Sequence, residues 1–173
     1  MKRIVSFTVS LLLAVSVAGA QELTAKQRKV QKEQEIKELI DSRQFRFVAR
    51  SVLPMSGPRI DLTSVYDLQI DSTAVEAWLP FYGRAYHVEY GDRDGGMKFK
   101  GQAEDMDVQY HKRKKMYEFS FTVDTSKDQY QVRLSAGLSG YADVSINSNN
   151  RQGISYYGII EPLEKADEKL QQQ

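Results

Sequence analysis

The sequence predicts a mainly β fold, either a single antiparallel barrel or a two-layer β-sandwich of about nine meandering strands, preceded by an N-terminal helix. Two observations support this. From Gln44 almost to the end, apolar residues recur at every second position, and short turn-forming segments separate these runs. Strict alternation gives each strand one face on a core and one face in water, as in antiparallel sheets. No helical pattern interrupts the runs, which argues against parallel βαβ units. Barrel and sandwich both stay open at this point.

The region 21–43 is expected to form the N-terminal helix. Most of it is dense in Lys, Glu and Gln and contains neither Gly nor Pro, and Thr24 is suited to cap the start. A thin apolar stripe at helical spacing follows, made of Val30, Ile36, Leu39 and Ile40. We expect the second half of the helix to cover an end or an open edge of the β-structure. A partner-binding coiled coil would need more apolar heptad positions.

The β domain is expected over 44–163, as a single domain followed by a polar tail at 164–173. Its strands are predicted where the alternation is strict, at residues 45–49, 66–70, 75–79, 97–103, 106–110, 117–123, 130–134, 142–146 and 154–160. The connections are short and rich in Gly, Asp, Asn and Ser, which favours hairpins. No internal repeat or Pro-rich linker divides the region.

Residues 1–20 have the layout of a cleaved signal peptide. Lys2 and Arg3 provide a positive start, residues 4–17 are mostly apolar, and Ala18-Gly19-Ala20 gives a small-x-small cleavage site before Gln21. The apolar run is shorter than the ~20 residues that a membrane span needs. We therefore expect an exported protein without a stable membrane anchor.

Charge and cysteine content exclude several classes of protein. The leader carries two cations and no acid, which leaves 22 Lys and Arg against 23 Asp and Glu, a net charge of −1. A nucleic-acid partner is therefore not expected, because such proteins normally carry a basic surplus. The absence of cysteine excludes disulfides, thiolate metal sites and a cysteine nucleophile. An exported chain of this kind fits the Gram-negative periplasm, with secretion as the second choice.

No group of residues in the sequence indicates catalysis. The two histidines, His87 and His111, are far apart, and the sequence has no phosphate loop, dinucleotide fingerprint or nucleophile elbow. Among the acidic residues, no spacing singles out a catalytic pair. We expect a protein that is not an enzyme and has no cofactor or metal.

Two loops resemble an ion-binding site only in part. Asp92–Gly96 begins like a calcium loop but lacks its later ligands, so a Gly-rich turn explains it better. The basic run at 111–115 is interpreted as a solvated hairpin tip. An anion site for phosphate, sulfate or lipid headgroups is the alternative for that run.

Two segments have the composition of a binding surface, namely LPFYGRAY at 79–86 and SNNRQGISYYG at 148–158. Tyr, Trp, Arg and Asn combine a large contact area with hydrogen-bonding groups. If both segments reach the same end of the fold, a ligand pocket can form from Trp78, Tyr82, Arg84, Tyr86, Asn150, Arg151 and Tyr157. The alternative is structural: the Asn residues make a turn, and Arg151 binds loop carbonyls. Tyr156 falls on the core-facing register.

The same segments carry a resemblance. The export signal, the Lys/Glu-rich helix and the motifs YDLQI, LPFYGRAY and SINSNNRQGISYYGIIEPL resemble a family of exported Bacteroidetes proteins described as a domain of unknown function (DUF4251-like). The likeness covers roughly 38–163 and implies an exported, mainly β domain from a Gram-negative bacterium. It implies no activity or site residue. Many relatives have a lipoprotein cysteine where this chain has Ala20-Gln21, so no lipid tether is expected.

Three hypotheses about function follow. The leading one is an exported, non-catalytic binding or interaction module, with an unknown small molecule or an envelope protein as partner. The second is a structural or stress protein of the envelope that contacts a protein partner through its helix or an exposed strand edge. The third is a carboxylate-dependent hydrolase, which would need two acids close together beside a groove.

Overall fold

The structure is a computed structural model that describes residues 24–86 and 95–163. The predicted signal peptide, the predicted tail, His87 and most of the loop at 91–96 lie outside the described residues. The chain divides into two compact units, residues 1–31 and 32–173. No helix among the described residues is long and apolar enough to cross a membrane.

The helix α2 (Ala25–Ser42) runs through the region where the sequence predicts one. In the first unit, Thr24 caps it, as predicted. The Thr24 hydroxyl accepts a hydrogen bond from the Gln27 amide at 3.4 Å, and the Gln27 side-chain oxygen accepts one from the Thr24 amide at 2.8 Å. This reciprocal pair satisfies amides that have no partner within the first turn.

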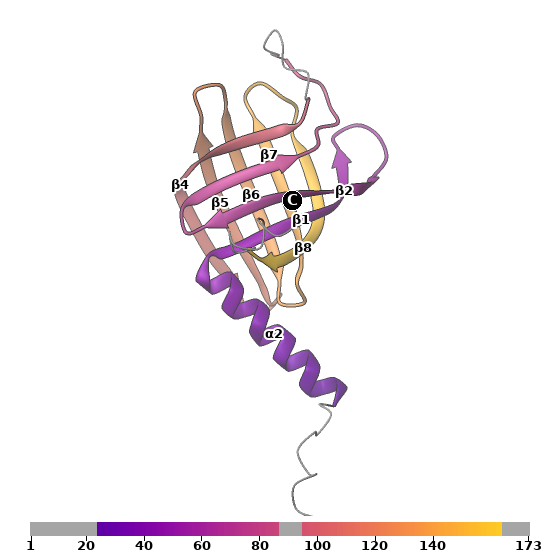
Figure 1. Cartoon of the computed structure of the whole chain (residues 1–173), viewed down its shortest axis with the longest axis vertical. Helices are drawn as coiled ribbons and strands as arrows, with labels where there is room; N and C mark the ends of the chain where they lie inside the picture. The colour runs from indigo at the N-terminus through magenta and orange to yellow at the C-terminus, as the bar shows by residue number, and fades with distance from the viewer. Residues whose placement is uncertain (1–23, 87–94, 164–173) are drawn as a thin grey trace, which may run out of the picture. The chain divides into compact units, whose positions relative to one another are not determined.

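The second unit contains a closed barrel of eight antiparallel strands, which decides between the two predicted architectures. Each strand pairs with the next along the chain, and β1 pairs with β8 to close the ring (Figure 1). The strands are β1 (Gln44–Pro54), β2 (Ile60–Asp71), β3 (Ala74–Leu79), β4 (Met97–His111), β5 (Met116–Asp124), β6 (Gln129–Gly137), β7 (Tyr141–Ser148) and β8 (Ile154–Pro162). Each described strand therefore has a neighbour on both sides, and the closed ring has no edge strand.

The described residues form eight strands and not about nine, because the two predicted strands 97–103 and 106–110 form one continuous strand. β4 runs through both, and its register with β5 shifts between Glu104 and Asp107. Asp105 lies in this bulge with a φ of 51°. A bulge of this kind bends a strand without ending it, and in the sequence it looks like a turn.

The alternating apolar residues fill the interior of the barrel. The largest fully buried side chains include Tyr156, Phe45, Phe47 and Phe119. An eight-stranded barrel is just wide enough for side chains to fill it. A ligand site has therefore to be sought on the outer surface or at the barrel ends.

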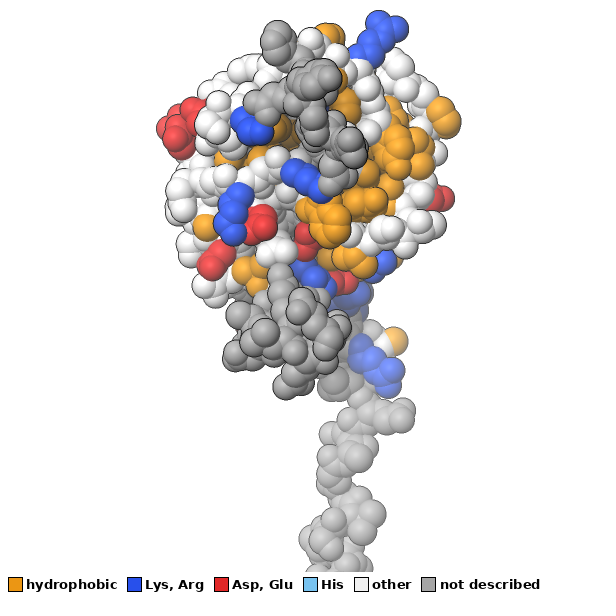
Figure 2. Space-filling view, turned by 45° about the horizontal axis from the view of Figure 1, so that its top comes forward, with side chains coloured by type: hydrophobic (Ala, Val, Ile, Leu, Met, Phe, Trp, Pro, Cys, Tyr) orange, Lys and Arg blue, Asp and Glu red, His pale blue; other side chains and the backbone are white. Residues whose placement is uncertain are grey.

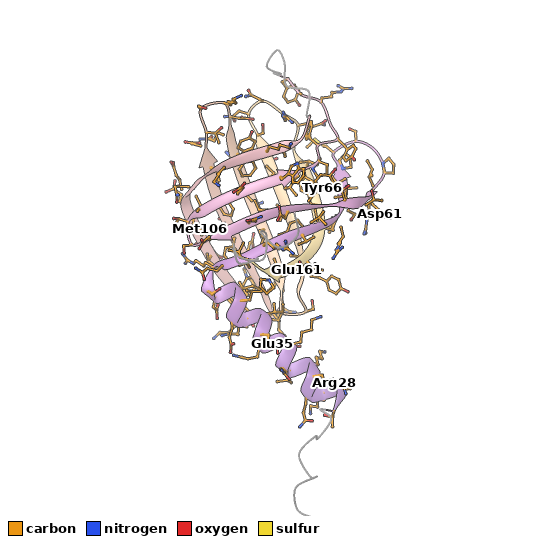
Figure 3. The ribbon with its side chains drawn as sticks, viewed as in Figure 1. Arg28, Glu35, Asp61, Tyr66, Met106 and Glu161 are labelled. Atoms are coloured by element: carbon orange, nitrogen blue, oxygen red, sulfur yellow. The ribbon has the colours of Figure 1, made fainter. Side chains whose placement is uncertain are left out.

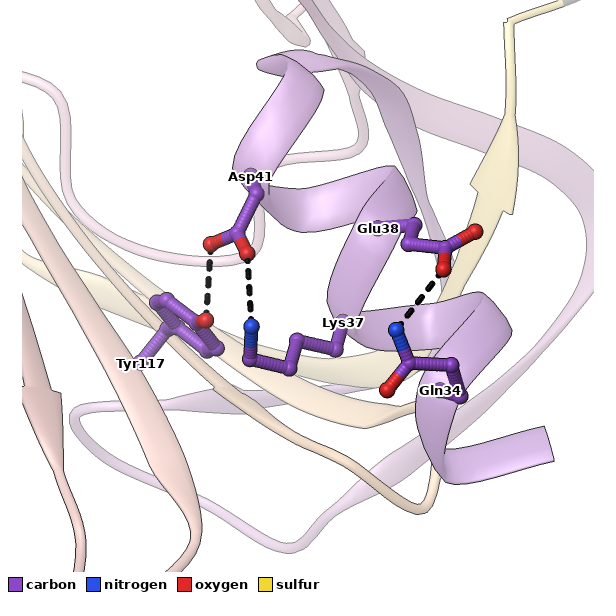
Figure 4. A network of polar contacts seen from close by, with 5 residues as sticks. All are labelled: Gln34, Lys37, Glu38, Asp41 and Tyr117. Carbon is purple, nitrogen blue, oxygen red and sulfur yellow. Dashed lines mark hydrogen bonds and ion pairs between the residues drawn. The ribbon is translucent and has the colours of Figure 1, made fainter. Parts of the chain in front are cut away.

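The second half of α2 packs against one end of the barrel, as expected. Ile40 belongs to the buried core, and Ile36 and Leu39 pack against it. The Tyr117 hydroxyl donates a hydrogen bond of 2.7 Å to Asp41, which also pairs with Lys37 (Figure 4). Burial raises the pKa of Tyr117, and the bond to the Asp41 carboxylate raises it further. The connections β1–β2, β3–β4, β5–β6 and β7–β8 lie at the other end.

Candidate functional site

The two aromatic segments lie side by side at the end of the barrel away from α2. An isolated bridge pairs Ala85 with Arg151. The Tyr86 amide donates a hydrogen bond of 2.7 Å to the Asn150 carbonyl, and the Gln152 amide donates one of 3.0 Å to the Arg84 carbonyl. The β3–β4 connection is therefore fastened to the β7–β8 loop by backbone hydrogen bonds.

Asp128 organises the β7–β8 loop from the neighbouring connection. Its carboxylate accepts hydrogen bonds from the Ser148 hydroxyl and from the Asn149 amide. The Asn150 side chain donates a hydrogen bond of 3.0 Å to the Lys127 carbonyl. Asn150 thus has the structural role that the sequence left open as its alternative.

Arg151 holds the β3–β4 connection in place. Its Nη1 donates hydrogen bonds of 2.9 and 2.8 Å to the carbonyls of Gly95 and Gly96. Its guanidinium carbon lies 5.3 Å from the centre of the Phe81 ring, within the range of a cation–π contact. Arg151 therefore binds loop carbonyls and at the same time supports an aromatic side chain.

Tyr156 supports the same segment from inside the core. Its ring is fully buried, and its hydroxyl donates a hydrogen bond of 2.8 Å to the Pro80 carbonyl. Burial raises the pKa of Tyr156, Arg151 opposes the rise, and Tyr82 adds to it. The hydroxyl therefore stays a donor, and it fixes the chain where β3 ends.

A shallow groove lies beside the segment that Arg151 and Tyr156 hold in place. It has a volume of about 300 Å³ and is lined by Tyr66, Trp78, Leu79, Pro80, Phe81, Tyr82, Gly95, Gly96 and Lys98. We call it the aromatic groove. Strand pairing brings its walls together, because Trp78 is opposite Lys98 of β4 and opposite Asp67, the neighbour of Tyr66, on β2.

The rings in the aromatic groove meet at steep angles. Tyr66 and Trp78 form a T-shaped pair with centres 5.9 Å apart and planes at 77°. The Lys98 amino group lies 5.2 Å from the centre of the Trp78 ring. Trp78 is nevertheless 52% exposed and Tyr82 42% exposed. Figure 2 shows hydrophobic side chains gathered in one area of the surface, at the right of the view, and Figure 3 labels Tyr66 on β2.

The structure brings some of the predicted site residues together and separates others. Trp78 and Tyr82 line the aromatic groove, while the exposed Arg84 and Tyr86 are not among its lining residues. Tyr157 lies on the outer face of β8, opposite Ser51 and Asp143, with the Arg59 guanidinium 5.8 Å from its ring centre. Sequence reasoning missed the roles of Tyr66, Phe81 and Lys98.

A larger depression of about 660 Å³ lies near the other ends of β2, β3 and β4, and Leu163 is one of its lining residues. Its polar side chains bond to one another or to neighbouring side chains. Lys100 pairs with Glu76 at 2.7 Å, and Gln44 donates a hydrogen bond of 3.1 Å to Asp71. The aromatic groove is the stronger candidate, because it exposes clustered aromatic side chains.

The basic run forms the turn between β4 and β5, as the hairpin interpretation predicts. Lys115 pairs with Glu33 of α2 at 3.0 Å, and His111 lies 3.2 Å from Glu118. Three or more His, Asp or Glu side chains that could hold a metal ion do not come together anywhere in the described ranges.

Comparisons with known proteins agree with this fold. A family model described as "Domain of unknown function (DUF4251)" matches residues 27–160. The chain is also similar to the crystal structure of a DUF4251 family protein from Bacteroides eggerthii DSM 20697. The two are 19% identical, the match covers 76% of this chain and 88% of that chain, and the TM-score is 0.58. At this identity the likeness shows the fold alone. No curated protein matches the chain.

Proposed function

The chain belongs to the DUF4251 family, a domain of unknown function, and from this starting point we propose that it is an exported, non-catalytic binding module whose ligand occupies the aromatic groove. One observation carries the proposal. Trp78 is half exposed on a closed barrel, next to Tyr66, Tyr82 and Lys98. Clustered exposed aromatic side chains on a soluble surface usually mark an interaction site.

The surroundings of the aromatic groove support binding in two ways. Trp and Tyr supply large contact areas with few rotatable bonds, which is why they dominate the energetics of interfaces. The hydrogen bonds from Tyr156 to Pro80 and from Arg151 to the two glycines hold the groove wall in one conformation. A preorganised wall loses little conformational entropy when a ligand binds.

The composition of the aromatic groove supports binding without catalysis. Its described lining residues include no Ser, His, Asp or Glu, and Lys98 and the two tyrosines are the titratable groups among them. Acid–base or nucleophilic catalysis needs a reactive group beside a proton donor or acceptor within hydrogen-bond reach. A groove of rings and one amine is better suited to holding a ligand than to changing it.

We place the module in the Gram-negative periplasm because of its predicted leader and its lack of cysteine. Expression in a Gram-negative host, osmotic release of the periplasm and mass measurement of the released chain test this. The expected mass is that of a chain starting at Gln21. A chain that stays in the cytoplasm or keeps residues 1–20 would contradict it.

Binding is tested by probing a peptide array and a glycan array with the labelled protein and two variants. Trp78→Ala removes the exposed ring from the aromatic groove. Tyr141→Ala is the matched control, because Tyr141 is 72% exposed at the start of β7, near the helix end of the barrel. We expect array members that bind the wild type and the control, with at least about tenfold weaker binding by Trp78→Ala.

Two results would contradict the proposal. The first is the absence of any binding by the wild-type protein on both arrays. The second is binding that Trp78→Ala retains in full, since the ligand would then contact another surface. Equal thermal unfolding of the three proteins shows that the comparison reports binding and not folding.

A further inference from the structure

We infer that the outer face of strands β5, β6 and β7 carries a second binding site, which holds one sugar unit of a neutral oligosaccharide by hydrogen bonds. This site is separate from the aromatic groove and stands whether or not that groove binds a ligand. Four observations support it, and they concern its shape, its free polar groups, its charge and a bulge in β4.

The site is a shallow depression of about 220 Å³, which we call the polar groove. It is lined by Asp105, Ser120, Phe121, Thr122, Gln131, Val132, Arg133, Ser145 and Asn147. Strand pairing arranges its polar side chains in two rows across β5, β6 and β7, with Ser120, Arg133 and Ser145 in one row and Thr122, Gln131 and Asn147 in the other. At ordinary strand spacings the two rows cover about 10 by 7 Å, which matches one sugar ring with its hydroxyl groups.

The hydroxyl and amide groups of the polar groove are free to bind a ligand. They form no side-chain hydrogen bond with any described residue, which holds for Ser120, Thr122, Gln131, Ser145 and Asn147. Elsewhere on the barrel, polar side chains of neighbouring strands bind each other. Lys100 pairs with Glu76 at 2.7 Å, and Arg46 pairs with Glu161 at 2.9 Å. A free hydroxyl or amide offers both a donor and an acceptor, as a sugar hydroxyl also does.

The charge and polarity of the lining favour a neutral, polar ligand. Asp105 and Arg133 are its charged residues, and the Arg133 Nε also lies 3.6 Å from a Glu118 carboxylate oxygen, so no positive surplus remains for an anion. One exposed carboxylate gives a cation little binding energy. Phe121 and Val132 are buried in the core, so the polar groove offers no apolar anchor to a peptide or a lipid and no ring to a base. A sugar binds through its hydroxyl groups and fits this lining.

A bulge in β4 adds a carboxylate to the polar groove. Ala103 and Met106, which Figure 3 labels, both pack against the core, so two successive residues between them are exposed instead of one. The second of these is Asp105, with a φ of 51°. It lines the polar groove, whereas Glu104 before it does not. Bulges of this kind re-aim a side chain next to functional sites. A carboxylate there can accept hydrogen bonds from two neighbouring hydroxyl groups of one sugar.

The polar groove is too small to enclose a whole ligand. Its volume is below the roughly 300–1,000 Å³ of sites that surround a small molecule. The ligand is therefore expected to be one unit of a longer chain whose other units lie outside. Hydrogen bonds at an open surface contribute little net free energy because they replace bonds to water, so the expected dissociation constant is about millimolar. Binding this weak is lost in the washing steps of an array, and the site needs a separate measurement.

The test is an NMR titration of the isotope-labelled protein with neutral tetrasaccharides of glucose, mannose, galactose and N-acetylglucosamine. Each is added to about 20 mM, because the expected binding is millimolar. We expect saturable shifts of the backbone amides of the polar groove with at least one tetrasaccharide. Gln131→Ala should bind it at least about threefold more weakly, since one amide is lost. Gln109→Ala is the matched control, because Gln109 is also an exposed strand residue but lies outside the polar groove.

The outcomes separate this site from the aromatic groove. Tetrasaccharide binding that Gln131→Ala weakens and Trp78→Ala leaves unchanged supports the inference. Binding that Trp78→Ala abolishes and Gln131→Ala retains would overturn the inference and support the proposed function. Shifts with none of the tetrasaccharides, or equal affinities of Gln131→Ala and Gln109→Ala, would also overturn it and leave the array test of the aromatic groove unaffected. The spectrum of each variant shows whether it is folded, so a loss of folding cannot imitate the expected result.

Discussion

Tyr156 shows how one side chain can serve both the core and the candidate site. Its ring lies inside the barrel, while its hydroxyl donates to the Pro80 carbonyl at the groove wall. Its position in the alternating pattern predicts burial, and burial is confirmed. The partner of its hydroxyl could not be predicted, because Pro80 is 76 residues away in the chain.

Replacing Tyr156 with Phe keeps the ring and removes the donor. The Pro80 carbonyl would lose its partner, so we expect the free energy of unfolding to fall by about 1–3 kcal/mol. Urea unfolding of the wild type and the variant measures this. Tyr141→Phe is the control, because its hydroxyl is on an exposed side chain and its removal should have little effect. Equal losses in the two variants would contradict the assigned role.

Asp143 provides a prediction about pH. Burial raises its pKa above the usual 3.8, a hydrogen bond from Ser135 opposes the rise, and the charge of Glu118 adds to it. The folded state therefore holds this proton more tightly than the unfolded state. The folded state is therefore destabilised relative to the unfolded state as pH rises through the pKa of Asp143 in the folded protein. This destabilisation is complete above that pKa.

Asp143→Asn should therefore raise the melting temperature at pH 7, because the amide carries no charge to desolvate. The advantage should shrink as pH falls toward about 3.5, where Asp143 is mostly protonated in both states. Melting curves of the two proteins at both pH values measure the difference. The variant also removes the repulsion between Asp143 and Glu118, which adds to the expected advantage at pH 7. An advantage that grows toward acid pH would contradict burial as the cause.

At the scale of elements, the pairing of β1 with β8 requires a glycine. A Cβ at Gly158 would collide with the Val48 carbonyl oxygen across the pair. We expect Gly158→Ala to lower the free energy of unfolding by at least about 2 kcal/mol, because backbone must move to make room. Gly95→Ala is the matched control, since nothing lies within 4 Å of its added Cβ. Thermal unfolding measures both, and a stable Gly158→Ala would contradict this packing.

The contact between α2 and the barrel gives a second prediction at this scale. Tyr117→Phe removes the hydrogen bond to Asp41 and should cost about 1–3 kcal/mol, because the acceptor is charged. Gln34→Ala is the control, since it removes only the bond to Glu38 within the helix (Figure 4) and should cost a few tenths of a kcal/mol. Urea unfolding distinguishes them. A Tyr117→Phe effect no larger than the control would show that packing alone holds the helix.

The elements were predictable because alternation reports locally which residues face the core. Each of the eight strands contains a segment that alternation indicates, although β1 and β2 extend well beyond theirs, and the helix lies in the Lys/Glu-rich segment. The bulge at Asp105 was not predictable, because its residues look like a turn between two strands. Tyr66 and Lys98 were missed for a related reason. They reach Trp78 only through the register of β2 and β4 with β3, which one sequence does not reveal.

At the scale of the whole molecule, barrel and sandwich differ in one long-range pairing. β1 and β8 are separated by most of the chain, and no local pattern indicates that they meet. Once they pair, the interior is filled and the functional surface is confined to the outside and the ends. This explains why two of the predicted aromatic residues, Trp78 and Tyr82, share a groove while Tyr157 lies elsewhere.

The central claim is that a ligand occupies the aromatic groove, and the chain carries its own reporter there. Trp78 is its only tryptophan. We would titrate the wild-type protein with an array member that binds it and follow tryptophan fluorescence. Burial of a half-exposed indole predicts a saturable shift of the emission to shorter wavelength, which should be unchanged in Tyr141→Ala. Ligand binding that calorimetry detects while the emission of Trp78 stays constant would contradict the account.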